Sequence, residues 1–338
     1  MSFEPVRMAS IGVGYWGRML AQGALASGRA QIVGCYSPTV ARCEAFAREF
    51  NAQPYASLAE ALEDPLVEAV LVATPNAEHA ADITRAAQAG KHILVEKPIT
   101  LSIEEAQVCI RACKNASVIL TVGHQYRREN PIRRMQAMIT AGEIGTVISV
   151  EANISTGTVL QQTPGSWRLE ERQVPGGPLV QIGIHHIDTL MYLLGRIESV
   201  SSLVRRRQVQ AIDDASVICL GFESGVLGTL VSNYCTTYSS VIKVMGTRGT
   251  LIYDRHQGLE IQQDTPERAN RRLIVVKPND PVREQVAEFA ACVRSGQAPE
   301  VRGEDGLLAM AVVLAALRSQ QEKRQVTLQE ILGNFTIN

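Results

Sequence analysis

The feature that most constrains this chain is a set of three glycines, Gly12, Gly14 and Gly17, between a short apolar segment and a helix-forming one. Glycines at this spacing allow a tight turn, a close approach of the backbone to a ligand and close packing of helix on strand. The helix N-terminus that follows can stabilise the charge of a pyrophosphate. The pattern therefore predicts a dinucleotide-binding turn that includes Tyr15 and Trp16.

The first third of the chain alternates short apolar runs with helix-forming segments. Residues 69–73 are continuously apolar, which is typical of a strand buried on both faces. Strands that alternate with helices predict a parallel sheet with right-handed crossovers. We therefore expect an α/β protein whose N-terminal domain, residues 1–123, is a doubly wound Rossmann sheet that binds NAD(P).

The pattern changes after Gly123. Residues 148–154 alternate apolar and polar side chains, which is typical of a strand with one dry and one wet face, and 222–225 predict a hairpin turn. We expect residues 124–338 to form a substrate-binding and oligomerisation α/β domain. We expect its large, mostly antiparallel sheet to have an open face. Its C-terminal helices could pack back on the first domain.

Composition excludes several classes of function. Lys and Arg total 33 against 34 Asp and Glu, a net charge of −1, so no basic footprint for nucleic acid exists. No apolar run approaches the roughly 20 residues of a membrane span. The seven cysteines form no C-x-x-C pair and no metal-ligand spacing. We expect a soluble, cytoplasmic protein with no metal, no nucleic-acid partner and no membrane partner.

The position that meets the adenine ribose lies at the end of the second predicted strand, and it is Ser37. A carboxylate there would accept the ribose hydroxyls and repel a 2′-phosphate. Serine does neither strongly, and Arg42 follows on the next predicted helix, either near a 2′-phosphate or simply solvated. The pair favours NADP and leaves NAD open.

Five further segments carry a family resemblance: T-P-N-A-E-H at 74–79, G-K-H-I-L-V-E-K-P at 90–98, G-H-Q at 123–125, W-R at 167–168 and G-I-H-H-I-D at 183–188. With the glycine turn, they resemble the Gfo/Idh/MocA oxidoreductase family over most of the chain. The resemblance implies a homodimer or homotetramer built through the open sheet. It also implies hydride transfer at a sugar or cyclitol carbon, and a cis peptide before Pro98.

The resemblance also assigns site residues. Thr74, Asn76, Glu96 and Gln125, together with His79, are expected to bind the cofactor, since polar groups at the carboxyl ends of parallel strands meet the ligand. Asn76 as a simple turn cap is the alternative. Lys97 and His185 are the expected catalytic pair that handles the proton of the reacting hydroxyl, as a lysine near a cationic nicotinamide and a histidine are both able to do.

The substrate is expected to meet Trp167, Arg168, Gln181 and Asp188. Arg168 could bind a carboxylate or phosphate, and so could Arg127 and Arg128 unless they are exposed. Trp167 could instead be a core residue. Asp188 could orient an imidazole or cap the helix predicted at 187–194, which follows a strand-like segment. His186 is expected to be structural.

One position departs from the family pattern: Gln181 stands where the family has an aspartate, four residues before His185. An amide can hydrogen-bond a hydroxyl but cannot act as a base, so the proton chemistry shifts to Lys97 and His185. Two alternatives to a dehydrogenase or reductase are a non-catalytic NAD(P)-binding regulator and a redox-type, NAD-dependent glycoside hydrolase.

Overall fold

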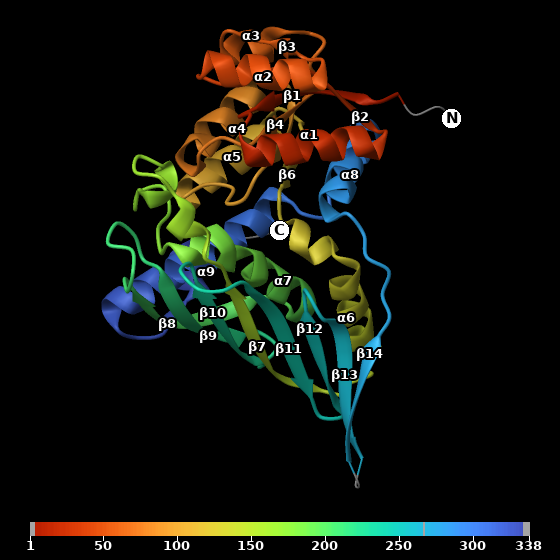
Figure 1. Cartoon of the computed structure of the whole chain (residues 1–338), viewed down its shortest axis with the longest axis vertical. Coiled ribbons are helices and arrows are strands. Elements are labelled where there is room, and N and C mark those ends of the chain that lie inside the picture. The colour runs from red at the N-terminus through yellow and green to blue at the C-terminus, as the bar shows by residue number, and fades with distance from the viewer. Residues whose placement is uncertain (1–3, 266–267, 334–338) are drawn as a thin grey trace. The chain divides into compact units, whose positions relative to one another are not determined.

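The computed structural model describes residues 4–265 and 268–333. The chain divides into two compact units (Figure 1). The first contains Met1–Gln125 and Asp280–Leu307, and the second contains Tyr126–Asn279 and Leu308–Asn338.

The first unit is built on a parallel sheet of six strands in the order β3-β2-β1-β4-β5-β6. This order confirms the doubly wound sheet, and it puts the topological switch point between β1 and β4, where open α/β sheets bind ligands. The strands are β1 (Val6–Ile11), β2 (Ala30–Tyr36), β3 (Gln53–Pro54), β4 (Ala69–Val72), β5 (His92–Val95) and β6 (Leu120–Val122).

Helices cover the sheet of the first unit (Figure 1). They are α1 (Tyr15–Ser27), α2 (Val40–Phe50), α3 (Leu58–Glu63), α4 (His79–Gln88), α5 (Ile103–Asn115) and α8 (Pro281–Ser295). Helix α8 packs on α1 and on strands β1, β2 and β5, although about 250 residues separate α8 from α1 in the sequence. Gly23 makes room for this packing, because a Cβ there would lie 3.2 Å from the Val282 side chain.

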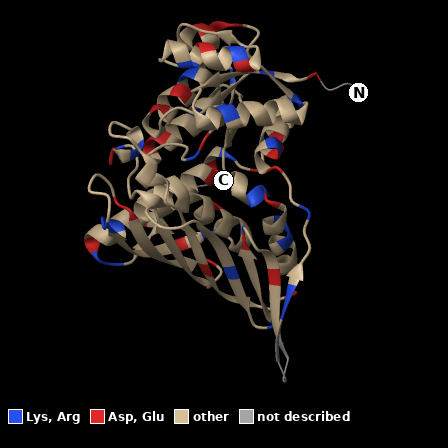
Figure 2. Ribbon diagram, viewed as in Figure 1, with Lys and Arg blue, Asp and Glu red and all other residues tan. Residues whose placement is uncertain are grey.

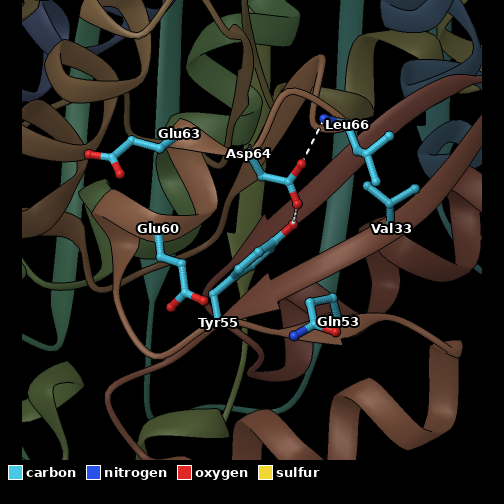
Figure 3. A pocket seen from close by; sticks show the side chains of 7 residues that line it. All are labelled: Val33, Gln53, Tyr55, Glu60, Glu63, Asp64 and Leu66. Carbon is cyan, nitrogen blue, oxygen red and sulfur yellow. Dashed lines mark hydrogen bonds between the residues drawn. The ribbon is translucent and has the colours of Figure 1, made fainter.

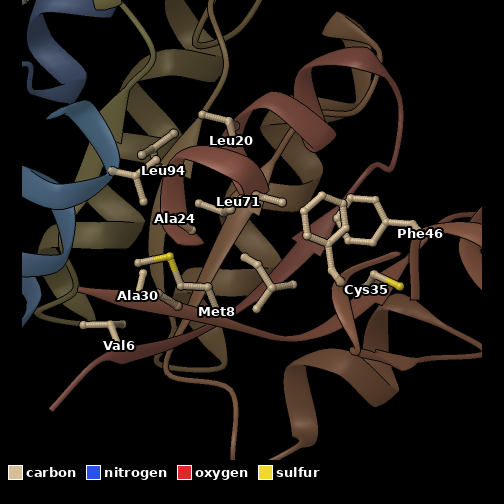
Figure 4. Close-up of a cluster of buried hydrophobic side chains, with 14 of the residues drawn as sticks. Val6, Met8, Leu20, Ala24, Ala30, Cys35, Phe46, Leu71 and Leu94 are labelled. Carbon is tan, nitrogen blue, oxygen red and sulfur yellow. The ribbon is translucent and has the colours of Figure 1, made fainter. Parts of the chain in front are cut away.

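The core of the first unit lies between its strands and these helices (Figure 4). Met8, Leu71 and Leu94 come from three neighbouring strands, while Leu20 and Phe46 come from α1 and α2, and all are fully buried. Each such side chain contributes about 1.5–3 kcal/mol of transfer free energy. The core therefore holds the carboxyl ends of β1, β4 and β5 in a fixed order.

The second unit is built on a sheet of nine strands in the order β14-β13-β12-β11-β7-β10-β9-β8-β15. The pairing is antiparallel except between β7 and β10, which confirms the expected mostly antiparallel sheet. The strands are β7 (Val147–Ser155), β8 (Ile197–Arg205), β9 (Ala215–Phe222), β10 (Leu227–Asn233), β11 (Ser239–Gly246), β12 (Gly249–Asp254), β13 (Gly258–Thr265), β14 (Arg268–Ile274) and β15 (Val326–Thr327).

One face of this sheet packs on helices and the other is open. Helices α6 (Asn130–Thr140) and α7 (Ile184–Leu194) contact strands of the sheet, and the long helix α9 (Gly303–Glu322) bonds to β8 through its second half. A short helix, α10 (Leu328–Leu332), follows β15. Charged side chains are sparse along the strands (Figure 2).

Candidate functional site

The glycine turn joins β1 to α1 and forms a tight backbone crossing. Gly12 has φ +93°, and a Cβ on it would lie 2.5 Å from the carbonyl oxygen of Ala73. A Cβ on Gly17 would overlap the carbonyl oxygen of Gly12. Gly14, in contrast, faces open space at the N-terminus of α1, and no side chain caps that end. The first N–H groups of α1 are thus open to an anion beside Gly14, next to the exposed Tyr15 and half-buried Trp16.

The loop after β4 lies beside this turn, because Ala73 touches Gly12. The Thr74 hydroxyl donates to the Asp82 carboxylate at 2.8 Å, and burial raises the pKa of Asp82 to about 6. Asn76 is buried at the start of a 3₁₀ turn, η1 (Asn76–Glu78). Asp82, a residue of helix α4, therefore holds the Thr74 side chain of this loop in place.

His79 links the loop after β4 to the loop after β5. Its Nδ1 lies 2.7 Å from the Pro98 carbonyl oxygen and its Nε2 lies 3.0 Å from the Thr74 carbonyl oxygen. Burial lowers the pKa of His79 and the charge of Lys97 lowers it further, while the two carbonyl groups oppose this. Both ring nitrogens are occupied by the backbone, so the geometry supports an indirect role in which His79 positions the two loops.

The residues at the end of β5 lie on the same rim. Glu96 is buried, and its carboxyl group packs over Gly123, where a Cβ would lie 3.2 Å from Oε1. Lys97 is half-buried, and the Lys97–Pro98 peptide is cis, as the resemblance implied. Gln125, which follows β6, is 2% exposed. Its amide oxygen has no hydrogen-bond partner within residues 4–265 and 268–333.

The rim of the first unit fits a dinucleotide. An uncapped helix end faces open space at Gly14, which follows β1. The buried amide oxygen of Gln125, which follows β6, has no hydrogen-bond partner in the described residues, as expected of a site for a polar ligand. Ser37, just after β2, is half-buried and accepts a hydrogen bond from Thr39 N at 3.4 Å. Arg42 is exposed on α2.

In the second unit, His185 does not follow a strand. The expectation of a strand before the helix was wrong: residues 179–183 form a π-helix, η5 (Leu179–Gly183), which runs directly into α7. A short apolar run does not distinguish a buried strand from a buried helix. His185 is thus the second residue of α7, and it is 4% exposed.

The imidazole of His185 stacks on Tyr126, with ring centroids 4.2 Å apart and 16° between the planes. The Arg255 guanidinium donates to the Tyr126 hydroxyl at 2.5 Å and also lies 4.3 Å from the centre of its ring. Glu129 holds Arg255 at 2.8 Å and accepts from the Tyr253 hydroxyl at 2.6 Å. Burial raises the pKa of Tyr126 to about 12, so the stacking ring is a neutral phenol.

Asp188 is fully buried and pairs with Arg127 through both carboxylate oxygens, one of them 2.8 Å from Nε. The capping alternative was wrong, because Asp188 lies inside α7, whose N-cap is Gly183. The alternative in which Arg127 and Arg128 are exposed was also wrong, since they are 6% and 1% exposed. His186 is buried and burial lowers its pKa to about 3, which supports a structural role.

Arg168 and Gln181 are hydrogen-bonded to each other. Arg168 Nη1 donates to Gln181 Oε1 at 2.7 Å, and the guanidinium lies 4.3 Å from the Trp167 ring centre. Trp167 and Arg168 are half-buried, so Trp167 is not a core residue. The structure thus brings together the predicted pair Arg168 and Gln181, and adds the buried Tyr234 beside them.

A cavity lies on the outer edge of the first sheet, formed by β2, β3 and the segment from α3 to β4 (Figure 3). In it, the Tyr55 hydroxyl donates to Asp64 at 2.6 Å. None of the predicted site residues lines it. The part of the chain that the structure describes contains no group of three or more His, Cys, Asp or Glu side chains that could hold a metal, and no helix in it has both the length and the apolar character to cross a membrane.

Residues that contact the site and were not found from the sequence include Asp82, Tyr126, Tyr234 and Arg255. Asp82 had a signal, since it lies one helical turn after His79 and so faces the same way. Arg255 had none, because the turn after β12 is brought to Tyr126 only by the fold of the second sheet.

Fold and site together define a dinucleotide-binding oxidoreductase architecture, and comparisons with known proteins agree. Residues 6–124 match the family model described as "Oxidoreductase family, NAD-binding Rossmann fold", and 136–328 match its "C-terminal alpha/beta domain". The chain therefore belongs to the Gfo/Idh/MocA oxidoreductase family.

Two curated relatives cover most of the chain. A scyllo-inositol 2-dehydrogenase (NAD(+)) of Bacillus subtilis is 32% identical over 337 residues, covering 93% of this chain and 94% of its own. A myo-inositol 2-dehydrogenase of Thermotoga maritima is 30% identical over 286 residues, covering 81% and 84%.

Solved structures show the same fold. A candidate NADPH-dependent oxidoreductase from Desulfitobacterium hafniense superimposes with a TM-score of 0.94 at 33% identity, covering 98% of this chain and all of its own. A levoglucosan dehydrogenase in complex with NADH and levoglucosan gives a TM-score of 0.89 at 21% identity, covering 96% of this chain and 100% of its own, which shows the fold alone.

The stacking of Tyr126 on His185 predicts a difference between two substitutions. Tyr126→Phe keeps the ring, whereas Tyr126→Leu removes it, so Tyr126→Leu should unfold with about 0.5–1.5 kcal/mol less free energy than Tyr126→Phe. Chemical denaturation measures this, and NMR of the His185 ring should show a loss of ring-current shift in Tyr126→Leu alone. Equal stabilities and unchanged His185 signals would contradict the stacking.

Proposed function

We propose that this protein is an NAD(P)-dependent dehydrogenase or reductase that transfers a hydride between the nicotinamide and a CH–OH or C=O carbon of a sugar, sugar derivative or cyclitol. Lys97 and His185 handle the proton. The observation that carries the proposal is the meeting of the open helix end at Gly14, the Thr74 loop and Lys97 at the carboxyl ends of β1, β4 and β5. Relatives named as inositol dehydrogenases support this substrate class.

When bound, the nicotinamide supplies or accepts the hydride. The chain's own residues bind, orient and move protons. Gly14 and the first N–H groups of α1 hold the pyrophosphate, while Thr74, Asn76, Glu96 and Gln125 provide polar contacts along the rim.

The proton of the reacting hydroxyl passes to or from Lys97. This amine is half-buried, and His79 fixes the backbone on which it stands by bridging Pro98 and Thr74. His185 supplies a second acid–base group, because its ordinary pKa lies near neutrality. Stacking on Tyr126 holds its ring plane, and a fixed orientation of an acid–base group favours proton transfer.

We propose NADP as the preferred cofactor. Ser37 presents no carboxylate that would repel a 2′-phosphate, and Arg42 is exposed on the helix that follows. The ratio of the NADPH and NADH dissociation constants, measured by fluorescence, tests this. A ratio that favours NADH, or that is unchanged by Arg42→Ala, would contradict it.

Replacing the proton-handling groups should separate binding from chemistry. Lys97→Met and His185→Asn should each lower kcat by about 10²–10⁴-fold, while the NAD(P)H dissociation constant changes little, since neither side chain carries the pyrophosphate. Turnover over a panel of polyols and oxidised sugars, with fluorescence titration, measures both. Absence of NAD(P)H binding to the unaltered protein would refute the function, and full activity of both variants would favour a regulator.

We propose that two copies pair through the open face of the second sheet to form a homodimer or homotetramer. Strand register places Val241, Asn153, Val231, Val217 and Leu203 in one row across five strands of this face. Leu203 is 60% exposed and Val217 is 44% exposed. Four of the five side chains in this row are apolar, and an exposed apolar patch is typical of an interface.

Substitution in this row should dissociate the oligomer. Val217→Glu places a charge within the row and is expected to give a monomer in sedimentation velocity. Val108→Glu is the matched control, because Val108 is similarly exposed, at 46%, but lies on α5 of the first unit. A monomeric unaltered protein, or an oligomer that survives Val217→Glu, would contradict the proposal.

We also propose that the protein works in the cytoplasm. All seven cysteines are free thiols, and five of them are buried, as suits a reducing compartment. Cell fractionation tests this directly, and recovery from an oxidising compartment would contradict it.

A further inference from the structure

The charge balance around Arg168 points to the kind of substrate that the second unit binds. A guanidinium has five N–H donors and no way to lose its charge. The acceptors that Arg168 contacts are both neutral: the amide oxygen of Gln181, at 2.7 Å, and the hydroxyl of Tyr234. The Trp167 ring on which it stacks is neutral as well.

Carboxylates close by in the chain are committed to other arginines. Glu170 lies 2.9 Å from Arg172, and Glu171 lies 2.5 Å from Arg206. Within residues 4–265 and 268–333, no carboxylate forms an ion pair with Arg168. The positive charge of this side chain is therefore not balanced by the protein where it is half-buried.

The surroundings fix Arg168 rather than leave it to move in solvent. Gln181 is 5% exposed on η5, directly after two buried residues at 179 and 180, and Tyr234 is 3% exposed. Stacking on Trp167 sets the plane of the guanidinium. A planar, oriented fork of donors recognises a carboxylate or a phosphate in bidentate geometry.

The residue at position 181 decides whether the charge of Arg168 is balanced within the protein. The family pattern has an aspartate there, and an aspartate at 2.7 Å from Arg168 Nη1 would neutralise the guanidinium internally. Gln181 keeps the hydrogen bond and removes the negative charge. The substitution thus leaves Arg168 positioned and frees its charge for a ligand.

From this geometry we propose that the substrate is an anionic sugar or cyclitol, whose carboxylate or phosphate group pairs with Arg168. This rests on the proposed function, which it narrows from polyols in general to acidic ones. The anionic group provides the orientation, while the reacting CH–OH carbon is handled by the proton-moving residues.

Matched probe pairs test the proposal by isothermal titration calorimetry in the presence of NADPH or NADH. D-Glucuronate and D-glucose 6-phosphate are each compared with D-glucose, and the first arm reports a carboxylate while the second reports a phosphate. A charge-assisted bidentate pair predicts at least about tenfold tighter binding of one anionic probe than of D-glucose. Gln181→Asp should remove that preference, since it balances the charge of Arg168.

Arg168→Gln should also abolish the preference, while Arg172→Gln is the matched control: Arg172 is in the same loop, its side chain is 82% exposed, and its loss should leave the preference intact. Equal binding of charged and neutral probes, no binding of any anionic probe, or a preference that survives Gln181→Asp would each overturn the inference. Failure of the proposed function is distinct, because it appears as absence of NAD(P)H binding to the unaltered protein before any sugar is added.

Discussion

Close contact between three backbone segments at the glycine turn sets the geometry of the first unit. Gly12 lies against the carbonyl group of Ala73, and Gly17 lies against the carbonyl group of Gly12, so a side chain at either position would push apart β1, α1 and β4. Because these segments touch, the open N-terminus of α1 and the Thr74 loop stand next to each other. His79 then links that loop to Pro98, and Lys97 is the residue directly before Pro98. The cofactor rim is a consequence of backbone packing as much as of its polar side chains.

The second unit holds several polar and charged side chains in buried positions. Several of them have partners: Asp188 pairs with Arg127, Glu129 contacts Arg255 and Tyr253, and His185 stacks on Tyr126. Breaking a buried pair is costly because it leaves one charge uncompensated. Arg168 differs from Arg127 and Arg255, since the acceptors that it contacts are neutral. That contrast is why its charge is assigned to a ligand and not to the stability of the fold.

Much of the fold was accessible from the sequence, since the signals were local. Residues 69–73 and 148–154 were predicted as strands, and the structure has β4 at Ala69–Val72 and β7 at Val147–Ser155. The glycine pattern predicted the turn that leads from the first strand into α1. The short α3 and the strands β13 and β14 were missed, because their patterns are brief or polar. The segment before His185 was taken for a strand, since a short apolar run suits either element. Among site residues, Arg168 and Gln181 were expected separately, but their hydrogen bond, and the role of Arg255, depend on long-range folding that no local spacing reports.

The central proposal is that the carboxyl ends of β1, β4 and β5 bind a nicotinamide dinucleotide and that Lys97 and His185 move the proton. A crystal structure of the complex with NADPH or NADH tests it most directly. The account predicts the pyrophosphate beside Gly14, and both the Lys97 amine and the His185 ring near C4 of the nicotinamide, at hydrogen-bonding range of a bound hydroxyl. A cofactor bound elsewhere, or a nicotinamide remote from either side chain, would contradict it.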